Sequence, residues 1–388
     1  MSTHFSAGIP FDHQARTRII FGMDTAARAG ELARETGMTR VLLVTDQGIV
    51  SAGHADRVRQ SLHKAGLETV LFDKVRENPT TVDVDICLAA AKNGGIDGII
   101  GLGGGSSMDT AKGCNFLLTN GGRMQDYWGV GKAFMSMLPL IAIPTTAGTG
   151  SECQTFALIA DAETHQKMAC GDPKAAARIA ILDPALTLSQ PRRVTACTGL
   201  DALSHALETA VSKKRNALSL AFSREAWRLC GSSLPLVLQE GANIEARAGM
   251  LLGAALGGLA IENSMLGAAH AAANPLTAHF RLVHGQAVGL MLPAVIRFNA
   301  ADPAVARMYD ELGEIKSTRL ADRVEWLLNL AGMPRSLADC GVTPDSIPML
   351  AAEAAKQWTA GFNPRPIGEK DFRGLFEAAF EPRGPGEP

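Results

Sequence analysis

Residues 101–112 read Gly-Leu-Gly-Gly-Gly-Ser-Ser-Met-Asp-Thr-Ala-Lys, and this stretch decides the fold of the first half of the chain. Residues 97–101 are predicted to form a strand that runs into the glycines, and a helix is predicted to follow with Ser106 or Ser107 as its N-cap. Glycine lets the backbone pass close to phosphate oxygens, and the N–H groups at a helix start face negative charge. The stretch therefore predicts a βα turn that binds a diphosphate, unless its glycines serve only tight packing.

The spacing of these glycines excludes two common phosphate loops. The stretch lacks the Gly-x-Gly-x-x-Gly order of the Rossmann fingerprint, and it lacks the Gly-Lys-Ser/Thr of a P-loop. Kinase-like chemistry is therefore disfavoured, whereas binding of a dinucleotide diphosphate fits the strand–turn–helix context.

Strands and helices alternate on both sides of this turn. The run Thr-Arg-Val-Leu-Leu-Val-Thr-Asp at 39–46 is aliphatic and β-branched, which is typical of a buried parallel strand. Other elements are predicted in the same way, with strands at 16–22, 68–73, 138–143 and 177–183 and helices at 25–36, 51–65 and 81–94. The alternation predicts a doubly wound, parallel α/β domain.

A second loop follows the strand predicted at 138–143. It reads Pro-Thr-Thr-Ala-Gly-Thr-Gly-Ser-Glu at 144–152 and is dense in hydroxyl groups and small residues. Such a loop can donate several hydrogen bonds to a ribose, a phosphate or an amide. The alternative is a solvated turn, which seldom carries so many hydroxyls beside a phosphate-type loop.

The pattern changes after Pro191. From 194 to about 300 the chain reads as successive helices rich in small residues, and 308–380 continues helical with breaks at prolines. We therefore predict two domains, an α/β domain at 1–190 and an all-helical domain at 191–388.

The helical half carries a set of residues suited to a metal ion. Asp201 and His205 are four residues apart in a stretch without a helix breaker, so one helix face presents both. His270 and His284 follow in the next apolar, Ala- and Gly-rich segments. One carboxylate and three imidazoles suit a borderline divalent ion such as Fe²⁺ or Zn²⁺. Any single Asp-x-x-x-His pair is common by chance, but the four together favour a catalytic metal site.

Composition limits the partners and the compartment. The formal net charge of −2 gives no electrostatic basis for binding nucleic acid or an anionic membrane. Seven scattered cysteines fit reduced thiols in a cytoplasm better than a disulfide framework. The polar N-terminus predicts no signal peptide, and the uncharged segment 248–261 is short for a membrane span, so we expect a buried helix there.

With these motifs in order, the sequence resembles the iron-containing, group III alcohol dehydrogenases over nearly its whole length. The resemblance rests on 103–112, on Ile-Pro-Thr-Thr-Ala-Gly-Thr-Gly-Ser-Glu at 143–152, on Gly-Leu-Asp-Ala-Leu-Ser-His-Ala-Leu-Glu at 199–208, and on His270 with His284-Gly285. Asn-Pro-Arg-Pro at 363–366 is similar to the closing signature of the family. The resemblance implies a dinucleotide-binding α/β domain, an all-helical metal domain, and hydride transfer between a nicotinamide and a metal-bound alcohol or aldehyde.

The resemblance also implies roles for individual residues. It makes Asp201, His205, His270 and His284 the metal ligands and catalytic set, with Fe²⁺ expected and Zn²⁺ possible. The residues that it assigns to the cofactor are Asp46, Asn78, Gly104, Gly105, Ser106, Asp109, Thr145, Thr146, Thr149 and Lys167.

Asp46 bears on the choice of cofactor. It closes the strand at 39–46, where the family places an acidic residue at the adenosine ribose. A carboxylate there accepts from the 2′-hydroxyl and repels a 2′-phosphate, so we expect NAD rather than NADP. The alternative is that Asp46 only caps the next helix.

One position departs from the family pattern. Many members carry a histidine four residues after the third metal ligand, usually assigned to proton relay or to the substrate pocket, and here that position is Asn274. Because an amide does not titrate near neutrality, proton release must follow another route, such as His279, water or the nicotinamide ribose. We do not assign a relay histidine.

Several alternatives stay open from the sequence. A metal-free maleylacetate reductase branch would not need the four ligands, and the two loops are less similar to the zinc-dependent glycerol dehydrogenase branch. A non-catalytic NAD-binding sensor would keep the loops without the metal set. The sequence does not identify the alcohol or aldehyde, the physiological direction, the metal or the oligomeric state, for which a homodimer or larger assembly is expected.

Overall fold

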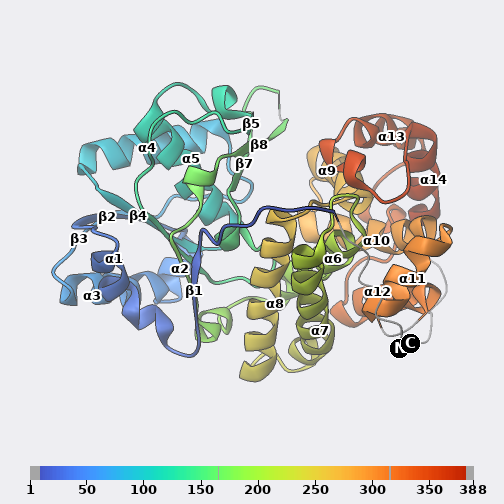
Figure 1. Ribbon diagram of the computed structural model, residues 1–388, viewed down its shortest axis with the longest axis horizontal. Coiled ribbons are helices and arrows are strands. Elements are labelled where there is room, and N and C mark those ends of the chain that lie inside the picture. The colour runs from blue at the N-terminus through green and yellow to red at the C-terminus, as the bar shows by residue number, and fades with distance from the viewer. Residues whose placement is uncertain (1–8, 165, 314–315, 382–388) are drawn as a thin grey trace. The chain divides into compact units, whose positions relative to one another are not determined.

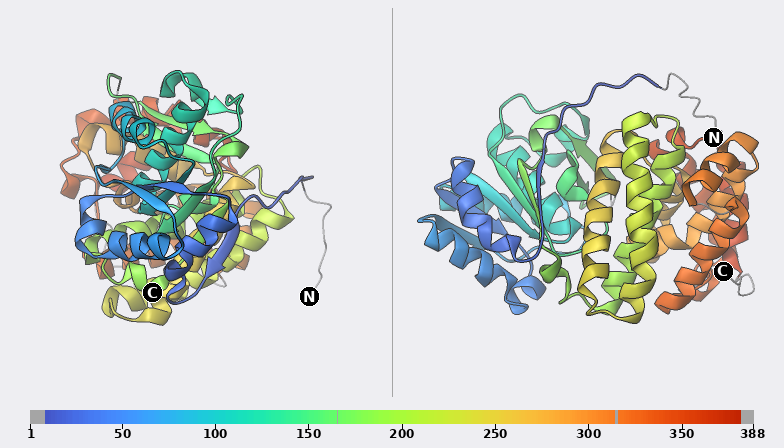
Figure 2. Two further views of the ribbon diagram at one scale, coloured as in Figure 1. Left: turned by 90° about the vertical axis from the view of Figure 1, so that its left-hand side faces the viewer. Right: turned by 60° about the horizontal axis from the view of Figure 1, so that its bottom comes forward.

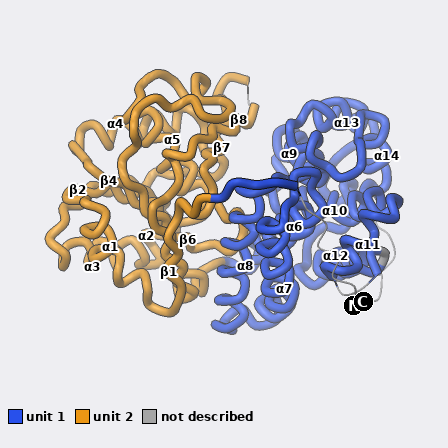
Figure 3. Tube along the Cα trace, viewed as in Figure 1, with its two compact units in different colours: residues 1–13, 191–388 blue, residues 14–190 orange. Residues whose placement is uncertain are grey.

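The computed structural model of the 388-residue chain describes residues 9–164, 166–313 and 316–381 (Figure 1). The chain divides into two compact units (Figure 3). One is Gln14–Gln190, and the other is Pro191–Pro388 together with the segment before Gln14. The predicted domains 1–190 and 191–388 remain a proposal, because compactness does not test whether each part folds alone.

The first unit is built on a six-stranded sheet in which every neighbouring pair is parallel. Its strand order is β1-β9-β6-β4-β2-β3. The strands are β1 Arg18–Phe21, β2 Arg40–Val44, β3 Glu68–Phe72, β4 Gly98–Gly103, β6 Leu140–Pro144 and β9 Ile179–Leu182. Each was predicted within a few residues, because each is a short apolar run between turn residues.

Both faces of this sheet are covered, as the alternating side chains of β2 show. Val41 and Leu43 share a core with α1 (Ala29–Glu35) and α3 (His54–Lys64). The intervening Leu42 and Val44 share a second core with α4 (Thr81–Gly94) and α5 (Gly105–Asn120). Because successive side chains of a strand point to opposite faces, helices lie on both faces of the sheet. The predicted doubly wound α/β fold is confirmed.

The predicted helices differ in detail. The helix expected at 51–65 is α3, which begins after Gly53, whose φ of 79° is left-handed. The short helix α2 Gln47–Ser51, which was not predicted, precedes it. The helix expected at 25–36 begins as the 3-10 turn Thr25–Arg28 before α1.

A small second sheet was not predicted. It consists of β5 Gly129–Val130, β8 Lys167–Gly171 and β7 Phe156–Ala160, with β7 and β8 antiparallel. Its apolar residues pack against α4 and α5 in a third core, which includes Val84, Phe116 and Ile159. The sheet carries Lys167 at the first position of β8.

In the described residues of the second unit, all regular secondary structure is helical. Its helices are α6 Arg192–Val211, α7 Ala217–Gln239, α8 Ile244–Glu262, α9 Ala268–Phe280, α10 His284–Ala300, α11 Pro303–Gly313, α12 Ser317–Ala331, α13 Ile347–Ala355 and α14 Glu369–Phe380. The long helices α6, α7 and α8 lie side by side (Figure 2), and α10 packs on α6, α9 and α12.

Helix α8 contains the most apolar stretch of the chain. By length and composition it is the one described helix that could cross a membrane, but 61% of its most apolar window is buried inside the unit. It contacts both α6 and α7. The prediction of a buried core helix fits this packing.

Candidate metal centre and cofactor-binding loops

Helix α6 presents the first part of the candidate metal centre. Asp201, His205 and Glu208 are spaced i, i+4 and i+7, so they lie along one face of the helix. All three are nearly inaccessible to solvent, with exposed fractions of 4%, 4% and 3%. A carboxylate and an imidazole are therefore held in the interior by a rigid helix.

The other two histidines come from the neighbouring helices α9 and α10. His270 lies in the first turn of α9, and His284 is the first residue of α10. Gly285 permits the close approach of α10 to α6, because a Cβ there would lie 2.0 Å from the Cys197 carbonyl oxygen and 3.2 Å from the Asp201 Cβ. The pair His284-Gly285 thus places the imidazole beside Asp201.

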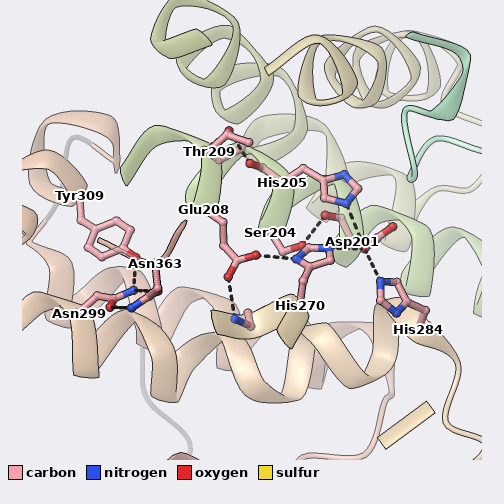
Figure 4. Close-up of polar contacts among 12 residues, drawn as sticks. Asp201, Ser204, His205, Glu208, Thr209, His270, His284, Asn299, Tyr309 and Asn363 are labelled. Atoms are coloured by element: carbon pink, nitrogen blue, oxygen red, sulfur yellow. Dashed lines mark hydrogen bonds and ion pairs between the residues drawn. The ribbon is translucent and has the colours of Figure 1, made fainter. Parts of the chain in front are cut away.

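The three imidazoles face one carboxylate oxygen, the Oδ1 of Asp201 (Figure 4). The Nε2 atoms lie 3.4 Å from it for His205, 3.5 Å for His270 and 3.9 Å for His284. The rings of His205 and His270 stack with centroids 5.0 Å apart. The structure therefore brings together all four residues predicted as metal ligands.

This arrangement fits a divalent ion. Two donors bound to one ion at about 2.1 Å and a tetrahedral angle lie about 3.4 Å apart, close to the separations observed. Among the described residues, Asp201 Oδ1 and His270 Nε2 are buried without a hydrogen-bond partner. Buried polar atoms are normally satisfied, so these two need a partner of another kind. Asp201, His270 and His284 each offer one ligand atom within 4.8 Å of the others.

The electrostatics of the centre favour an ionised Asp201. Burial alone would disfavour its charged form, but the three imidazoles outweigh burial and hold the pKa of Asp201 well below its usual range. Burial would likewise lower the pKa of His270, whereas Glu208 and Asp201 raise it to about 9. The two carboxylates give the centre the negative charge that a cation needs.

Glu208 was quoted in a motif but was given no role from the sequence. Its Oε2 lies 2.5 Å from His270 Nδ1, and its Oε1 accepts a hydrogen bond of 2.7 Å from the Ala269 N–H. The signal was available, because position i+7 after Asp201 falls on the same helix face.

The departure at Asn274 also has a defined environment. Its Nδ2 donates to Gln357 Oε1 at 2.9 Å. His279, considered for proton release, is nine residues beyond His270 and therefore about 13 Å farther along α9. Its Nε2 pairs instead with Glu353 Oε2 at 2.8 Å on the exposed surface. A direct contact between His279 and the metal centre is excluded.

In the first unit, the predicted cofactor residues gather where the glycine loop meets the threonine loop. A Cβ on Gly104 would lie 3.3 Å from Thr146 Cγ2, and one on Gly105 would lie 2.8 Å from Thr149 Cγ2. The loops also share a backbone hydrogen bond of 2.9 Å from Thr145 N–H to Gly103 O. The glycines therefore bring backbone and hydroxyls together at the carboxyl ends of β4 and β6.

Ser106 and Asn78, also predicted to bind the cofactor, contact each other beside the glycine loop. The Asn78 N–H donates to Ser106 Oγ at 3.2 Å, and Asn78 has a left-handed φ of 51°. Asn tolerates this conformation better than most residues. The backbone turn at Asn78 is thus tied to the first turn of α5.

Asp46 performs the capping role that was the alternative to cofactor binding. Its Oδ1 accepts from the Ile49 N–H at 3.0 Å, as the N-cap of α2. Its Oδ2 lies 3.5 Å from where a Cβ on Gly103 would stand, so the carboxylate also borders the glycine loop. The cap therefore does not remove Asp46 from the predicted cofactor set.

Asp109 is a buried charged residue whose carboxylate is influenced by the half-buried Lys167. Asp109 is buried and accepts from Ser151 Oγ at 3.1 Å. Burial raises the pKa of Asp109 to about 6, against the opposing charges of Lys112 and Lys167. Asp109 therefore holds the end of the threonine loop, and its part in diphosphate binding stays a prediction.

Lys112 was not singled out from the sequence as a cofactor or site residue. It is fully buried, and its Nζ donates to four oxygens at 2.6–3.0 Å, the carbonyls of Ser151, Gln154 and Phe156 and the Ser151 hydroxyl. A buried ammonium is tolerated only when it is hydrogen-bonded in this way. Lys112 thereby fixes the segment that follows the threonine loop.

Known proteins match the chain over most of both units. The family model described as iron-containing alcohol dehydrogenase matches residues 16–184, and the model of the C-terminal part of the Fe-containing alcohol dehydrogenase family matches 195–380. The chain belongs to the iron-containing alcohol dehydrogenase family. The family-level resemblance inferred from its motifs is confirmed, and the chain is an oxidoreductase of this family.

Relatives within the family match over almost the whole chain. A choline dehydrogenase of Bacillus subtilis is 36% identical over 377 residues, covering 94% of each protein. A crystal structure of a 1,3-propanediol oxidoreductase has a TM-score of 0.91 at 32% identity, covering 96% of this chain and 100% of that one. The sulfoacetaldehyde reductase of Bifidobacterium kashiwanohense, solved in complex with NAD⁺, has a TM-score of 0.88 at 29% identity, with 96% and 99% covered.

Proposed function

We propose that this protein is an NAD(H)-dependent, metal-dependent alcohol dehydrogenase that also reduces aldehydes. The observation that carries the proposal is the convergence of three imidazole Nε2 atoms on one oxygen of the buried Asp201. A divalent ion bound there would supply Lewis acidity that favours loss of the alcohol proton and polarises an aldehyde carbonyl.

The chain's own residues would prepare this chemistry in two places. Asp201, His205, His270 and His284 would hold the ion, and the burial of the first three would limit the access of water. The His284 side chain is 24% exposed. In the first unit, Gly104, Gly105 and Ser106 would offer backbone N–H groups at the start of α5 to the diphosphate. Thr145, Thr146 and Thr149 would border the same cofactor, with Asn78, Asp109 and Lys167 supporting the loops around it.

We propose NAD rather than NADP because the Asp46 carboxylate borders the glycine loop. Family membership and the NAD⁺ complex of the sulfoacetaldehyde reductase support a nicotinamide cofactor. Fe²⁺ is the proposed ion because both matching families are described as iron-containing alcohol dehydrogenases. The same nitrogen and oxygen donors also suit Zn²⁺.

The setting of this reaction is also a proposal. The seven free cysteines, six of them buried, suit a reducing cytoplasm. The partners are a small alcohol or aldehyde and a second copy of the chain in a dimer or larger oligomer. Neither nucleic acid nor a membrane is expected as a partner.

The test is anaerobic reduction of an aldehyde with NADH after the metal is stripped, followed by addition of Fe²⁺, Zn²⁺, Mn²⁺ or no ion. We expect activity to vanish on stripping and to return with one ion, which names the metal. In His284→Ala, metal and turnover should be lost together. Full activity of the stripped enzyme would contradict the proposal and favour a metal-free reductase. NADH binding without metal or turnover would favour a sensor.

A further inference from the structure

Glu208 lies behind the candidate metal centre and joins two of its helices. It projects from α6 and is 3% exposed. Its two carboxylate oxygens make different contacts with α9, one with the Ala269 N–H and one with His270 Nδ1 (Figure 4). We infer that Glu208 is a positioning residue that sets the tautomer and the ring direction of His270 for metal binding. The inference rests on the proposed metal-dependent function.

The tautomer follows from the chemistry of the two partners. An ionised carboxylate can only accept hydrogen bonds, so at a separation of 2.5 Å His270 Nδ1 must be the donor. A neutral imidazole carries one proton, and if this proton is on Nδ1 the lone pair is on Nε2. His270 Nε2 is the nitrogen that faces Asp201 Oδ1 at 3.5 Å. In the neutral imidazole that a metal ion requires, Glu208 therefore leaves the metal-facing Nε2 without a proton.

The ring direction follows from the second contact of Glu208. Ala269 belongs to the first turn of α9, where backbone N–H groups have no partner within the helix. Glu208 Oε1 accepts this N–H at 2.7 Å, while Oε2 contacts the adjacent side chain. One rigid carboxylate thus fixes both the start of the helix and the imidazole that the helix carries.

Space for this carboxylate depends on Gly267. A Cβ on Gly267 would lie 3.1 Å from Glu208 Oε1 and 3.3 Å from Asn363 Oδ1. Both are closer than ordinary carbon–oxygen packing allows, so a side chain at 267 would press on the carboxylate. The glycine at 267, just before α9, therefore leaves the space that the Glu208 carboxylate occupies when it contacts α9.

The direct test replaces Glu208 with an isosteric amide. Glu208 accepts two hydrogen bonds, whereas a glutamine has one accepting oxygen and one donating NH₂ group. In Glu208→Gln, either the Ala269 N–H or His270 Nδ1 must face a donor. If the NH₂ faces His270, the proton moves to Nε2, which blocks the metal-binding nitrogen.

The chain supplies a matched control on the same helix. His279 of α9 pairs with Glu353 at 2.8 Å, but both side chains are 40% exposed and lie away from the centre. We would measure Co²⁺ and Zn²⁺ affinity of the full-length protein by chelator competition for the wild type, Glu208→Gln and Glu353→Gln. The expected result is a loss of affinity of about 10- to 100-fold in Glu208→Gln and none in Glu353→Gln. The absorption spectrum of bound Co²⁺ should change only in Glu208→Gln.

A double-mutant cycle separates positioning from general damage to the fold. If Glu208 acts through His270, then Glu208→Gln should cost little further affinity in a His270→Ala background. An equal loss in both backgrounds would overturn the inference. Should Glu208→Gln fail to fold, metal affinity would be measured in Glu208→Asp instead. Aspartate keeps the negative charge, but its side chain is one methylene shorter, so the carboxylate no longer reaches His270. Wild-type affinity in Glu208→Asp or Glu208→Gln would overturn the inference.

The outcomes for the two proposals can be distinguished. A wild-type protein that binds neither Co²⁺ nor Zn²⁺ would contradict the proposed metal-dependent function. A wild type that binds the ions, with Glu208→Gln binding them equally well, would contradict only the role of Glu208.

Discussion

Glycine serves opposite purposes in the two sites of this molecule. In the first unit, Gly104 and Gly105 leave space beside the hydroxyl-bearing side chains of Thr146 and Thr149, and the backbone of this loop is the proposed binding surface. In the second unit, Gly285 and Gly267 bring protein atoms into contact, so that carboxylates and imidazoles from different helices converge. In the glycine loop, the missing side chains leave room for the proposed ligand. In the helical unit, they leave room for neighbouring helices and their side chains.

The difference predicts how each site responds to an added methyl group. At Gly285 the nearest obstructing atoms belong to the backbone of the packed helix α6, which cannot move alone. At the cofactor loops they belong to the tip of a threonine, which can rotate. The same substitution should therefore affect folding and metal binding in one unit, but only ligand binding in the other.

The largest effect is expected for Gly285→Ala. Its Cβ would overlap the Cys197 carbonyl at 2.0 Å, so α10 must shift from α6 and carry His284 away from Asp201. Overpacking of this kind costs about 1–3 kcal/mol of stability. We expect a lower Tm and nearly complete loss of bound metal, measured by thermal unfolding and elemental analysis.

Gly374→Ala is the matched control for that variant. Gly374 lies within α14, and an added Cβ meets no atom within 4 Å. Alanine is the better helix former, so this variant should be neutral or slightly stabilised. Normal metal content in Gly285→Ala would show that close helix approach does not build the centre.

A smaller effect is expected for Gly105→Ala. Its Cβ would meet Thr149 Cγ2 at 2.8 Å, and the threonine can turn away at little cost to folding. Alanine keeps the backbone N–H, but its methyl group would hold the diphosphate away from the loop, and the weaker hydrogen bond should lower NADH affinity about tenfold. Fluorescence titration measures this, with metal content and Tm expected to match the wild type. Unaltered NADH affinity would remove the glycine loop from the proposed cofactor site.

The smallest effect is expected for Asp46→Ser, which separates the two contacts of Asp46. Serine can still cap α2 by accepting the Ile49 N–H, so the helix should remain intact. Loss of the negative charge should raise kcat/KM with NADPH relative to NADH by about tenfold or less. Turnover with both cofactors provides the measurement. No gain with NADPH would leave Asp46 as a helix cap only.

Much of the first unit could be predicted from sequence because its main sheet consists of local signals. Strands such as β2 and β4 are short apolar runs between turns, and their order in the chain alternates with helices. The small sheet escaped prediction because β5 has only two residues and the fourth position of β8 is a cysteine between small residues. Its pairing depends on contacts with α4 and α5 that no local pattern contains.

The candidate metal centre was predictable for a different reason. Asp201 and His205 follow the period of one helix, and the family motifs supplied His270 and His284. The contact between Glu208 and His270 joins positions 62 residues apart, so periodicity suggested a shared face but not a partner. Lys112 shows the limit most clearly, since a lysine in an amphipathic pattern is normally assigned to solvent and this one is fully buried.

Helix α8 has a consequence for handling the protein. Its 19 residues are apolar enough to resemble a membrane span, and the helix packs against α6 and α7. On unfolding, this segment becomes an exposed apolar surface, which promotes aggregation before the chain can refold. Heat inactivation should then be irreversible, and the half-life at a given temperature would describe the durability of the protein better than an equilibrium constant.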